Sequence, residues 1–164
     1  MIDAVHPRGP GRPEPAWPRR GRAACALAAA VVALCAPAGG ARADVVRTNY
    51  VLHCSGCHGF DGAGAPSAGV PSMKGTVGHF LRTSEGRAFL VQVPGTANSS
   101  LNDADTAALL NWIVKTMSAA EMPPDFAPYT TSEVTRLRAA RPVDITAVRA
   151  RIVTDLQKLG YAIR

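Results

Sequence analysis

The sequence predicts an all-α protein, because its apolar residues recur at helical spacing in several separate segments. Between residues 102 and 117, Leu109, Trp112 and Ile113 follow the three- and four-residue steps of a helix. Residues 145–159 repeat the pattern with one apolar stripe. The chain has 164 residues, of which 47% are hydrophobic and 18% charged, so a single folded domain with additional segments is expected and wholesale disorder is not.

The first 43 residues have the pattern of a secretory signal peptide. Three arginines between residues 19 and 22 precede an apolar run at residues 23–38, and Ala41-Arg42-Ala43 follows as a small-x-small cleavage site. We expect cleavage after Ala43 and export to the periplasm, with an uncleaved anchor as the alternative. The run is too short and too alanine-rich for a good membrane span, so we expect no span after cleavage and exclude a polytopic membrane protein.

Removing residues 1–43 changes the charge of the protein. Six of the 18 basic residues and two of the 12 acidic residues lie there, so the net charge falls from +6 to +2. This low charge removes the main support for nucleic-acid binding. The remaining charge is uneven, because residues 44–130 carry −2 and residues 131–164 carry +4.

The remaining chain begins with a first helix, a loop and a short helix. Residues 45–54 predict a helix whose apolar contacts are Val46, Tyr50 and Leu52. Glycine and proline recur between residues 59 and 78, which predicts a long loop. A short helix begins at Ser84 and Glu85, carries Phe89, Leu90 and Val93, and ends at Pro94-Gly95.

The second half predicts three further helices. Asn102 is a good N-cap for a helix that ends near Met117. A short helix is expected from Ser132 to Ala140, and a last helix follows Asp144 and ends at Gly160. The last helix carries the apolar stripe Ile145, Val148, Ile152, Leu156 and Leu159. The basic extension at residues 131–164 either packs on the core with its charges in solvent, or forms a docking surface for an acidic redox partner.

One segment, Cys54-Ser55-Gly56-Cys57-His58, has the pattern of a cofactor-binding motif. Cys-x-x-Cys-His is the pattern for covalent attachment of a c-type haem. Positions i, i+3 and i+4 share a helix face, so both thiols would meet the porphyrin edge while His58 points toward the iron. Cys54 and Cys57 would then form the thioethers and His58 would be the proximal iron ligand.

Three other interpretations of the motif compete with haem attachment. A thioredoxin-like redox pair needs a βαβ context, but a glycine-rich loop follows His58. A zinc site lacks its second Cys/His pair. A local disulfide between Cys54 and Cys57 would not explain His58. Four cysteines in this length are also too few for a disulfide-rich scaffold.

The segment from Cys54 to Gly64 resembles the haem-binding segment of class I (mitochondrial-type) c cytochromes. Pro71-Ser72-Met73-Lys74-Gly75 is similar to that family's Pro-x-Leu-x-Gly stretch, with Met73 in place of leucine. Tyr50 and Trp112 match the aromatic positions at which the family's first and last helices cross. The resemblance implies a cytochrome domain at residues 44–118, built around one covalent haem c. Residues 119–164 then hold a probable ligand loop and the basic helical extension.

The sequence leaves the identity of the second axial ligand of the iron undecided. The resemblance implies methionine, and Met122-Pro123-Pro124 resembles the family's ligand loop, although it follows the helix that the ligand usually precedes. Met73 and His79 are the alternatives, and an open position is a further one. Met117 is assigned to a helix core. His53 is given no role, because it is expected to point away from the helix face that carries His58.

These features predict an exported monohaem c-type cytochrome that passes single electrons between periplasmic redox proteins and is not an enzyme. The first alternative is the haem subunit or dedicated partner of a periplasmic dehydrogenase. The second is a five-coordinate haem protein that binds gases or reduces peroxide. The sequence contains no Walker, Rossmann or catalytic-triad motif that would favour another class of protein.

Overall fold

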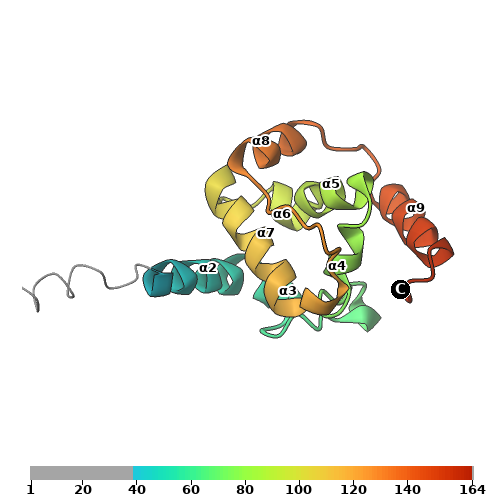
Figure 1. Cartoon of the computed structure of the whole chain (residues 1–164). Coiled ribbons are helices and arrows are strands. Elements are labelled where there is room, and N and C mark those ends of the chain that lie inside the picture. The colour runs from blue at the N-terminus through green and yellow to red at the C-terminus, as the bar shows by residue number, and fades with distance from the viewer. Residues whose placement is uncertain (1–38, 164) are drawn as a thin grey trace, which may run out of the picture. The chain divides into compact units, whose positions relative to one another are not determined.

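Helix α2 (Gly39–His53) packs against α7 (Asp103–Met117). The computed structural model describes residues 39–163, and Figure 1 shows α7 in the middle of the fold and α2 extending to its left. Tyr50 is buried where these two helices meet, and its ring centroid lies 5.4 Å from that of Trp112. This confirms the predicted contact between the two aromatic residues, and such pairs contribute beyond the area they bury.

The first helix begins earlier than predicted and buries a different set of residues. Val46 and Tyr50 are buried as expected, but Leu52 is 71% exposed. Residue 52 is two positions from Tyr50, so it points to nearly the opposite side of the helix. The helix also includes the expected cleavage site after Ala43, whereas the rest of the predicted signal peptide, residues 1–38, lies outside the described residues.

Short helices lie between α2 and α7, a further short helix follows α7, and no β-strand is present within residues 39–163. They are α3 (Ser55–His58), η1 (Pro66–Ala68), α4 (Val77–Phe80), α5 (Ser84–Gln92), α6 (Pro94–Ala97) and η2 (Ala119–Glu121). The all-α prediction is thus confirmed. Asn102 caps α7 as predicted, and Thr83 caps α5; each accepts a hydrogen bond from a backbone N–H three residues on. None of the helices between residues 39 and 163 is long and apolar enough to span a bilayer.

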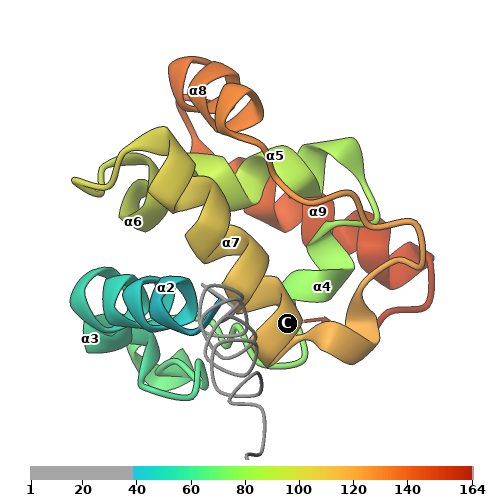
Figure 2. The same cartoon turned by 60° about the vertical axis from the view of Figure 1, so that its left-hand side comes forward.

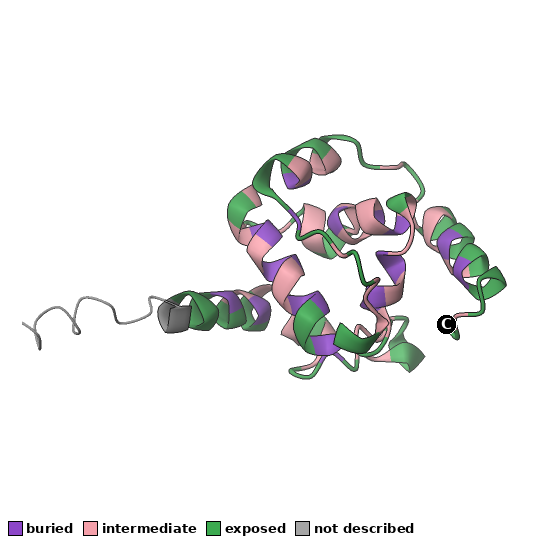
Figure 3. Ribbon diagram, in the orientation of Figure 1, coloured by how far each residue is buried: buried purple, intermediate pink, exposed green. Residues whose placement is uncertain are grey.

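The C-terminal extension packs onto the central helices. Helix α8 (Thr131–Ala139) contacts α7 and α5, and α9 (Ile145–Lys158) contacts α5 and α4 (Figure 2). On α9, Ile152 and Leu156 are buried against Phe80 and Phe89, and the outer side is exposed (Figure 3). Leu159 was expected in this apolar stripe but is 61% exposed, because the helix ends at Lys158 and the chain turns away.

A bidentate ion pair fastens α8 to α5. Arg87 donates from Nε to Glu133 Oε1 at 2.7 Å and from Nη2 to Oε2 at 2.8 Å. Its guanidinium also lies 4.2 Å from the ring centroid of Tyr129. The hydrogen bond from Arg87 is the main cause that lowers the pKa of Glu133 below its ordinary value of 4.5. Bidentate, partly buried pairs of this kind are stronger than surface ion pairs.

We predict that Glu133→Gln lowers the free energy of unfolding at pH 7 by about 2 kcal/mol. Because the folded state lowers the pKa of Glu133, its contribution is fully present above pH 4.5 and is lost as the pH falls through the folded pKa. The difference between wild type and variant should therefore shrink below pH 4.5. Urea unfolding followed by circular dichroism from pH 3 to 7 measures it. Glu85→Gln, which removes an exposed ion pair to Arg151, is the control and should cost much less.

Candidate haem-binding site

The Cys-x-x-Cys-His motif folds as one turn of helix at the end of α2. The N–H of Cys54 donates to Tyr50 O at 2.9 Å, and the N–H of His58 donates to Cys54 O at 3.0 Å. Cys54 is half-buried, Cys57 is exposed, and both thiols are free. Burial raises the pKa of the Cys54 thiol to about 11, so it is protonated at neutral pH. Cys57 and His58 thus lie on one short helix, α3, and Cys54 directly precedes it.

The imidazole of His58 is held by a backbone carbonyl. Its Nδ1 lies 3.2 Å from Pro71 O. A carbonyl can only accept, so Nδ1 carries the proton and Nε2 keeps its lone pair for a metal. Burial lowers the pKa of His58, which favours the neutral ring that ligation requires. The sequence analysis did not identify Pro71 as this partner, although the proline belongs to the Pro-x-Leu-x-Gly-like stretch.

The loop after His58 is folded back against the Pro71 segment. Gly64 adopts a φ of +70°, and a Cβ atom on it would lie 2.6 Å from Pro71 O. The N–H of Met73 donates to Gly62 O at 2.8 Å, and the Tyr50 hydroxyl donates to Gly59 O at 2.6 Å. The carbonyl that orients His58 is therefore itself positioned by close backbone packing that only glycine permits.

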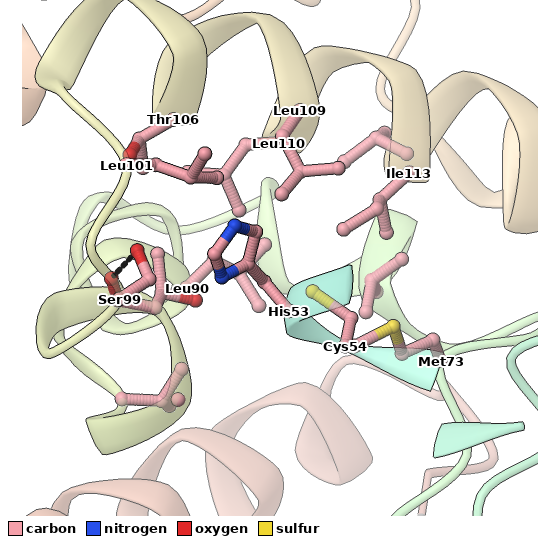
Figure 4. Close-up of a pocket in the computed structure, with 15 residues that line it drawn as sticks. His53, Cys54, Met73, Leu90, Ser99, Leu101, Thr106, Leu109, Leu110 and Ile113 are labelled. Atoms are coloured by element: carbon pink, nitrogen blue, oxygen red, sulfur yellow. Dashed lines mark hydrogen bonds between the residues drawn. The ribbon is translucent and has the colours of Figure 1, made fainter. Parts of the chain in front are cut away.

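A largely apolar cavity opens beside Cys54. Its enclosed space measures about 60 Å³, and the cavity is partly open to solvent. Cys54 and Met73 place their sulfur atoms on one side of it (Figure 4). All other lining residues except His53 and Val77 come from residues 90–114: Leu90, Val93, Gly95, Thr96, Ser99, Leu101, Thr106, Leu109, Leu110, Ile113 and Val114. Cys57 and His58 lie outside this lining.

His53, to which the sequence analysis gave no role, lines the cavity. Figure 4 shows its ring projecting between the Cys54 side and the side formed by Leu90 and Leu101. The sequence analysis considered only the face shared with His58. Helix α2 ends at His53 and α3 begins at Ser55, so the direction of His53 relative to His58 does not follow from ideal helical spacing.

The candidate second ligands lie in different places. Met73 lines the cavity, whereas Met122 follows η2 and packs, half-buried, against the core. His79 stacks on Tyr161, with 4.8 Å between the ring centroids. Met117 is buried as predicted and contacts Gly62. Neither Met122 nor His79 lines the cavity, because η2 packs on α4 and the C-terminal Tyr161 covers the His79 ring.

Arg138 of the extension fixes one wall of the cavity. Its Nη1 donates to Leu101 O at 2.9 Å and to Asp103 Oδ1 at 2.8 Å. Its Nη2 lies within 3.0 Å of three more oxygens: Thr96 O, Ser99 Oγ and Thr106 Oγ1. Four of these five acceptors belong to cavity-lining residues. The extension therefore builds part of the pocket, a role that sequence periodicity gave no signal for.

The donor set of the motif and the apolar lining beside Cys54 suit a porphyrin bound through the motif. An apolar wall excludes water from the ring, one thiol faces the cavity, and an oriented neutral imidazole follows on the same turn. No cluster of three or more His, Cys, Asp or Glu side chains suited to a metal ion occurs in the described chain. The geometry thus gives a closed zinc site no ligand set.

We predict that Gly64→Ala destabilises the fold more than Gly69→Ala does. Both glycines have positive φ, +70° and +78°, so both variants carry the same backbone cost of about 1 kcal/mol. Only at Gly64 would the new Cβ meet backbone oxygens, which adds about 1–3 kcal/mol. Urea unfolding of the two variants measures the difference. Equal losses would show that the Pro71 segment moves freely.

We also predict that Arg138→Met lowers the free energy of unfolding by about 3 kcal/mol, because it leaves buried acceptors without a donor. Arg136→Met, an exposed position on the same helix, should change it by less than about 0.5 kcal/mol. Chemical unfolding of both variants tests this. A small effect of Arg138→Met would mean that water replaces the guanidinium.

Comparison with known proteins places the chain in a family. No protein-family model matches it. Cytochrome c-552 of Thermus thermophilus is 30% identical over 119 aligned residues, which cover 60% of this chain and 90% of that protein. A second cytochrome c-552 from the same species is also 30% identical over 119 residues, covering 80% of its length. Together with the Cys-x-x-Cys-His turn and the helical fold, this similarity shows that the chain belongs to the c-type cytochrome family.

Proposed function

We propose that this protein is an exported class I cytochrome that carries one covalent haem c and transfers single electrons between redox proteins. The observation that carries the proposal is the turn from Cys54 to His58, whose imidazole is oriented by Pro71 O at 3.2 Å. The family relationship to cytochrome c-552 supports the same function. Haem, when bound, supplies an iron whose oxidation state changes by one, which allows the transfer of single electrons.

Cys54 and Cys57 would hold the porphyrin. Each thiol would form one thioether bond to the porphyrin, an addition that needs no oxidant or reductant. Cys54 faces the cavity and Cys57 faces solvent. One edge of the attached ring would thus lie near the surface, where a partner protein can approach it.

His58 would supply the proximal nitrogen to the iron. The hydrogen bond from Nδ1 to Pro71 O fixes the tautomer and restricts rotation of the ring. Such a partner also raises the electron density that Nε2 gives to a metal. The apolar side chains of α7, including Leu109 and Ile113, would exclude water from the ring and so help to set its potential.

Residues 1–43 would direct export, and residues 44–118 would form the cytochrome domain. We propose that the protein acts in the periplasm, where covalent haem attachment and soluble redox partners would meet it. The extension at residues 119–164 would complete the pocket through Arg138. Its exposed basic residues would assist docking to an acidic partner, including a dehydrogenase.

Covalent haem content tests this function. The full chain is produced in a bacterial host with c-type haem maturation, and haem is measured by pyridine haemochrome and by haem staining of a denaturing gel. We expect one haem per chain in wild type and none in the Cys54→Ala/Cys57→Ala double variant. Gly56→Ala is the control, because a Cβ there meets nothing within 4 Å, and it should retain haem.

Electrochemistry of the loaded protein then tests electron transfer. We expect one reversible one-electron wave and rapid electron exchange with a soluble redox protein. A wild-type chain that carries no haem after denaturation would contradict the proposed function. A haem protein without a reversible wave would contradict the electron-transfer role alone.

A further inference from the structure

The end of the chain folds back toward the short helix α4. Helix α9 ends at Lys158, and Gly160 adopts a φ of +90°, which turns the backbone. The N–H of Tyr161 then donates to Leu156 O at 3.1 Å. Residues 159–163 therefore form a C-terminal tail with a defined position.

Tyr161 of this tail covers two polar side chains. Its ring centroid lies 4.8 Å from that of His79 on α4 and 4.5 Å from the guanidinium carbon of Arg82. His79 Nδ1 and Arg82 Nε are both buried, and neither has a hydrogen-bond partner among the described residues. A buried nitrogen without a partner costs free energy, so the closed tail is less stable than its contacts alone would make it.

Apolar contacts hold the tail closed against this cost. Ile163 is 2% exposed and packs with Phe80 and Phe89, and the ring of Tyr161 lies at the edge of the same cluster. Within residues 159–163, Ile163 alone is buried. Opening of the tail therefore removes few apolar contacts and costs far less than global unfolding.

The protonation state of His79 affects the closed tail. Burial is the main cause that lowers the pKa of His79 below its ordinary value of 6.5. The positive charge of Arg82 lowers this pKa further, whereas the carboxylate of Glu121 on η2 raises it. A proton on His79 would thus place a second positive charge beside Arg82 in a partly buried site.

Helices α5, α7 and α9 also pack against α4. Their charged side chains are Glu85, Arg87, Asp103, Asp105, Lys115, Arg149, Arg151, Asp155 and Lys158. Six of these belong to the ion pairs Glu85–Arg151, Arg87–Glu133, Asp103–Arg138 and Asp155–Lys158. The charges that shift the pKa of His79 are those of Arg82 and Glu121.

The direction of the pH effect follows from this arrangement. An open tail exposes the His79 ring to water, where its pKa returns toward 6.5, so the open form binds more protons than the closed form. The stability that neutral His79 gives the closed tail is therefore fully present above pH 6.5 and is lost as the pH falls below that value.

We propose that the C-terminal tail is a pH-sensitive lid, closed over His79 and Arg82 when His79 is neutral and open more often when His79 carries a proton. The contacts that carry this inference lie outside the Cys54–His58 turn, so the lid does not depend on the proposed electron transfer. Opening adds two adjacent positive charges to the exposed surface, and these would attract acidic groups. Part of the surface would thus respond to the pH of the compartment.

Hydrogen exchange of the haem-loaded full chain tests the lid, measured by mass spectrometry on a peptide that contains residues 159–163. The N–H groups of Gly160, Tyr161 and Ile163 report opening, because each is hydrogen-bonded in the closed tail. After correction for the intrinsic pH dependence of exchange, we expect the open fraction to rise about threefold or more from about pH 7.5 to about pH 5.5. A peptide from α8 should show no such change.

The variant His79→Phe tests the titrating group. It keeps a ring against Tyr161 but cannot take up a proton, so exchange of the tail should no longer depend on pH after the same correction. Arg82→Gln removes the neighbouring cation and should weaken the pH dependence, whereas Glu121→Gln removes the carboxylate and should strengthen it. Lys158→Gln is the matched control, because it removes a charge beside the tail that does not shift the pKa of His79, and it should leave the pH dependence unchanged.

Several results would overturn the proposal. Equal open fractions at both pH values in the wild type would show that the tail does not respond to a proton. Greater protection at low pH would show that protonated His79 holds the tail closed. A pH dependence that survives in His79→Phe would assign it to another group. If His79→Phe does not fold, a change of the same sign in Arg82→Gln and Glu121→Gln would reject the lid.

Discussion

Tyr50 joins the core of this protein to its functional turn. Its ring is buried against Trp112 where α2 packs against α7, and its hydroxyl donates to Gly59 O at 2.6 Å. Gly59 directly follows His58, so the packing of two long helices also determines where the Cys-x-x-Cys-His turn stands. The buried aromatic ring makes a large apolar contact, and the hydrogen bond of its hydroxyl fixes the orientation of the side chain. Tyr50 thus links the position of the motif to the packing of the core.

The same coupling continues on the other side of the cavity. The C-terminal extension reaches back by 32 to 42 residues through Arg138 to hold the wall at residues 96–106. Because the acceptors are mostly backbone carbonyls and hydroxyls of lining residues, the guanidinium acts as a fastening for the pocket. The charge of Arg138, which contributes to the basic character of residues 131–164, therefore serves the interior as well as the surface.

Electron transfer makes a specific demand on the pocket of a cytochrome. A carrier benefits from surroundings that rearrange little when an electron arrives. The imidazole of His58, oriented by Pro71 O, and the apolar lining supplied by α7 are both fixed by the fold, which suits that demand.

The sequence by itself determined the local features of the protein. Helix caps such as Asn102 and Asp144, and the Cys54–His58 turn, depend on contacts between residues three or four positions apart, which a pattern can specify. The Tyr50–Trp112 contact was also predicted, through the resemblance to a known fold. The exposure of Leu52 and Leu159 was not, because apolar spacing does not reveal where neighbouring helices stop covering a face.

Only the tertiary structure decided which groups share the cavity. Pro71 and His58, Arg138 and Thr96, and His53 and the wall of α7 come together from distant parts of the chain, so no short-range pattern links them. All three candidate second ligands have side chains that can bind iron, and folding placed Met73 in the cavity lining but Met122 and His79 outside it. The physical reason is that ligand chemistry is a property of a residue type, whereas access to the iron is a property of packing.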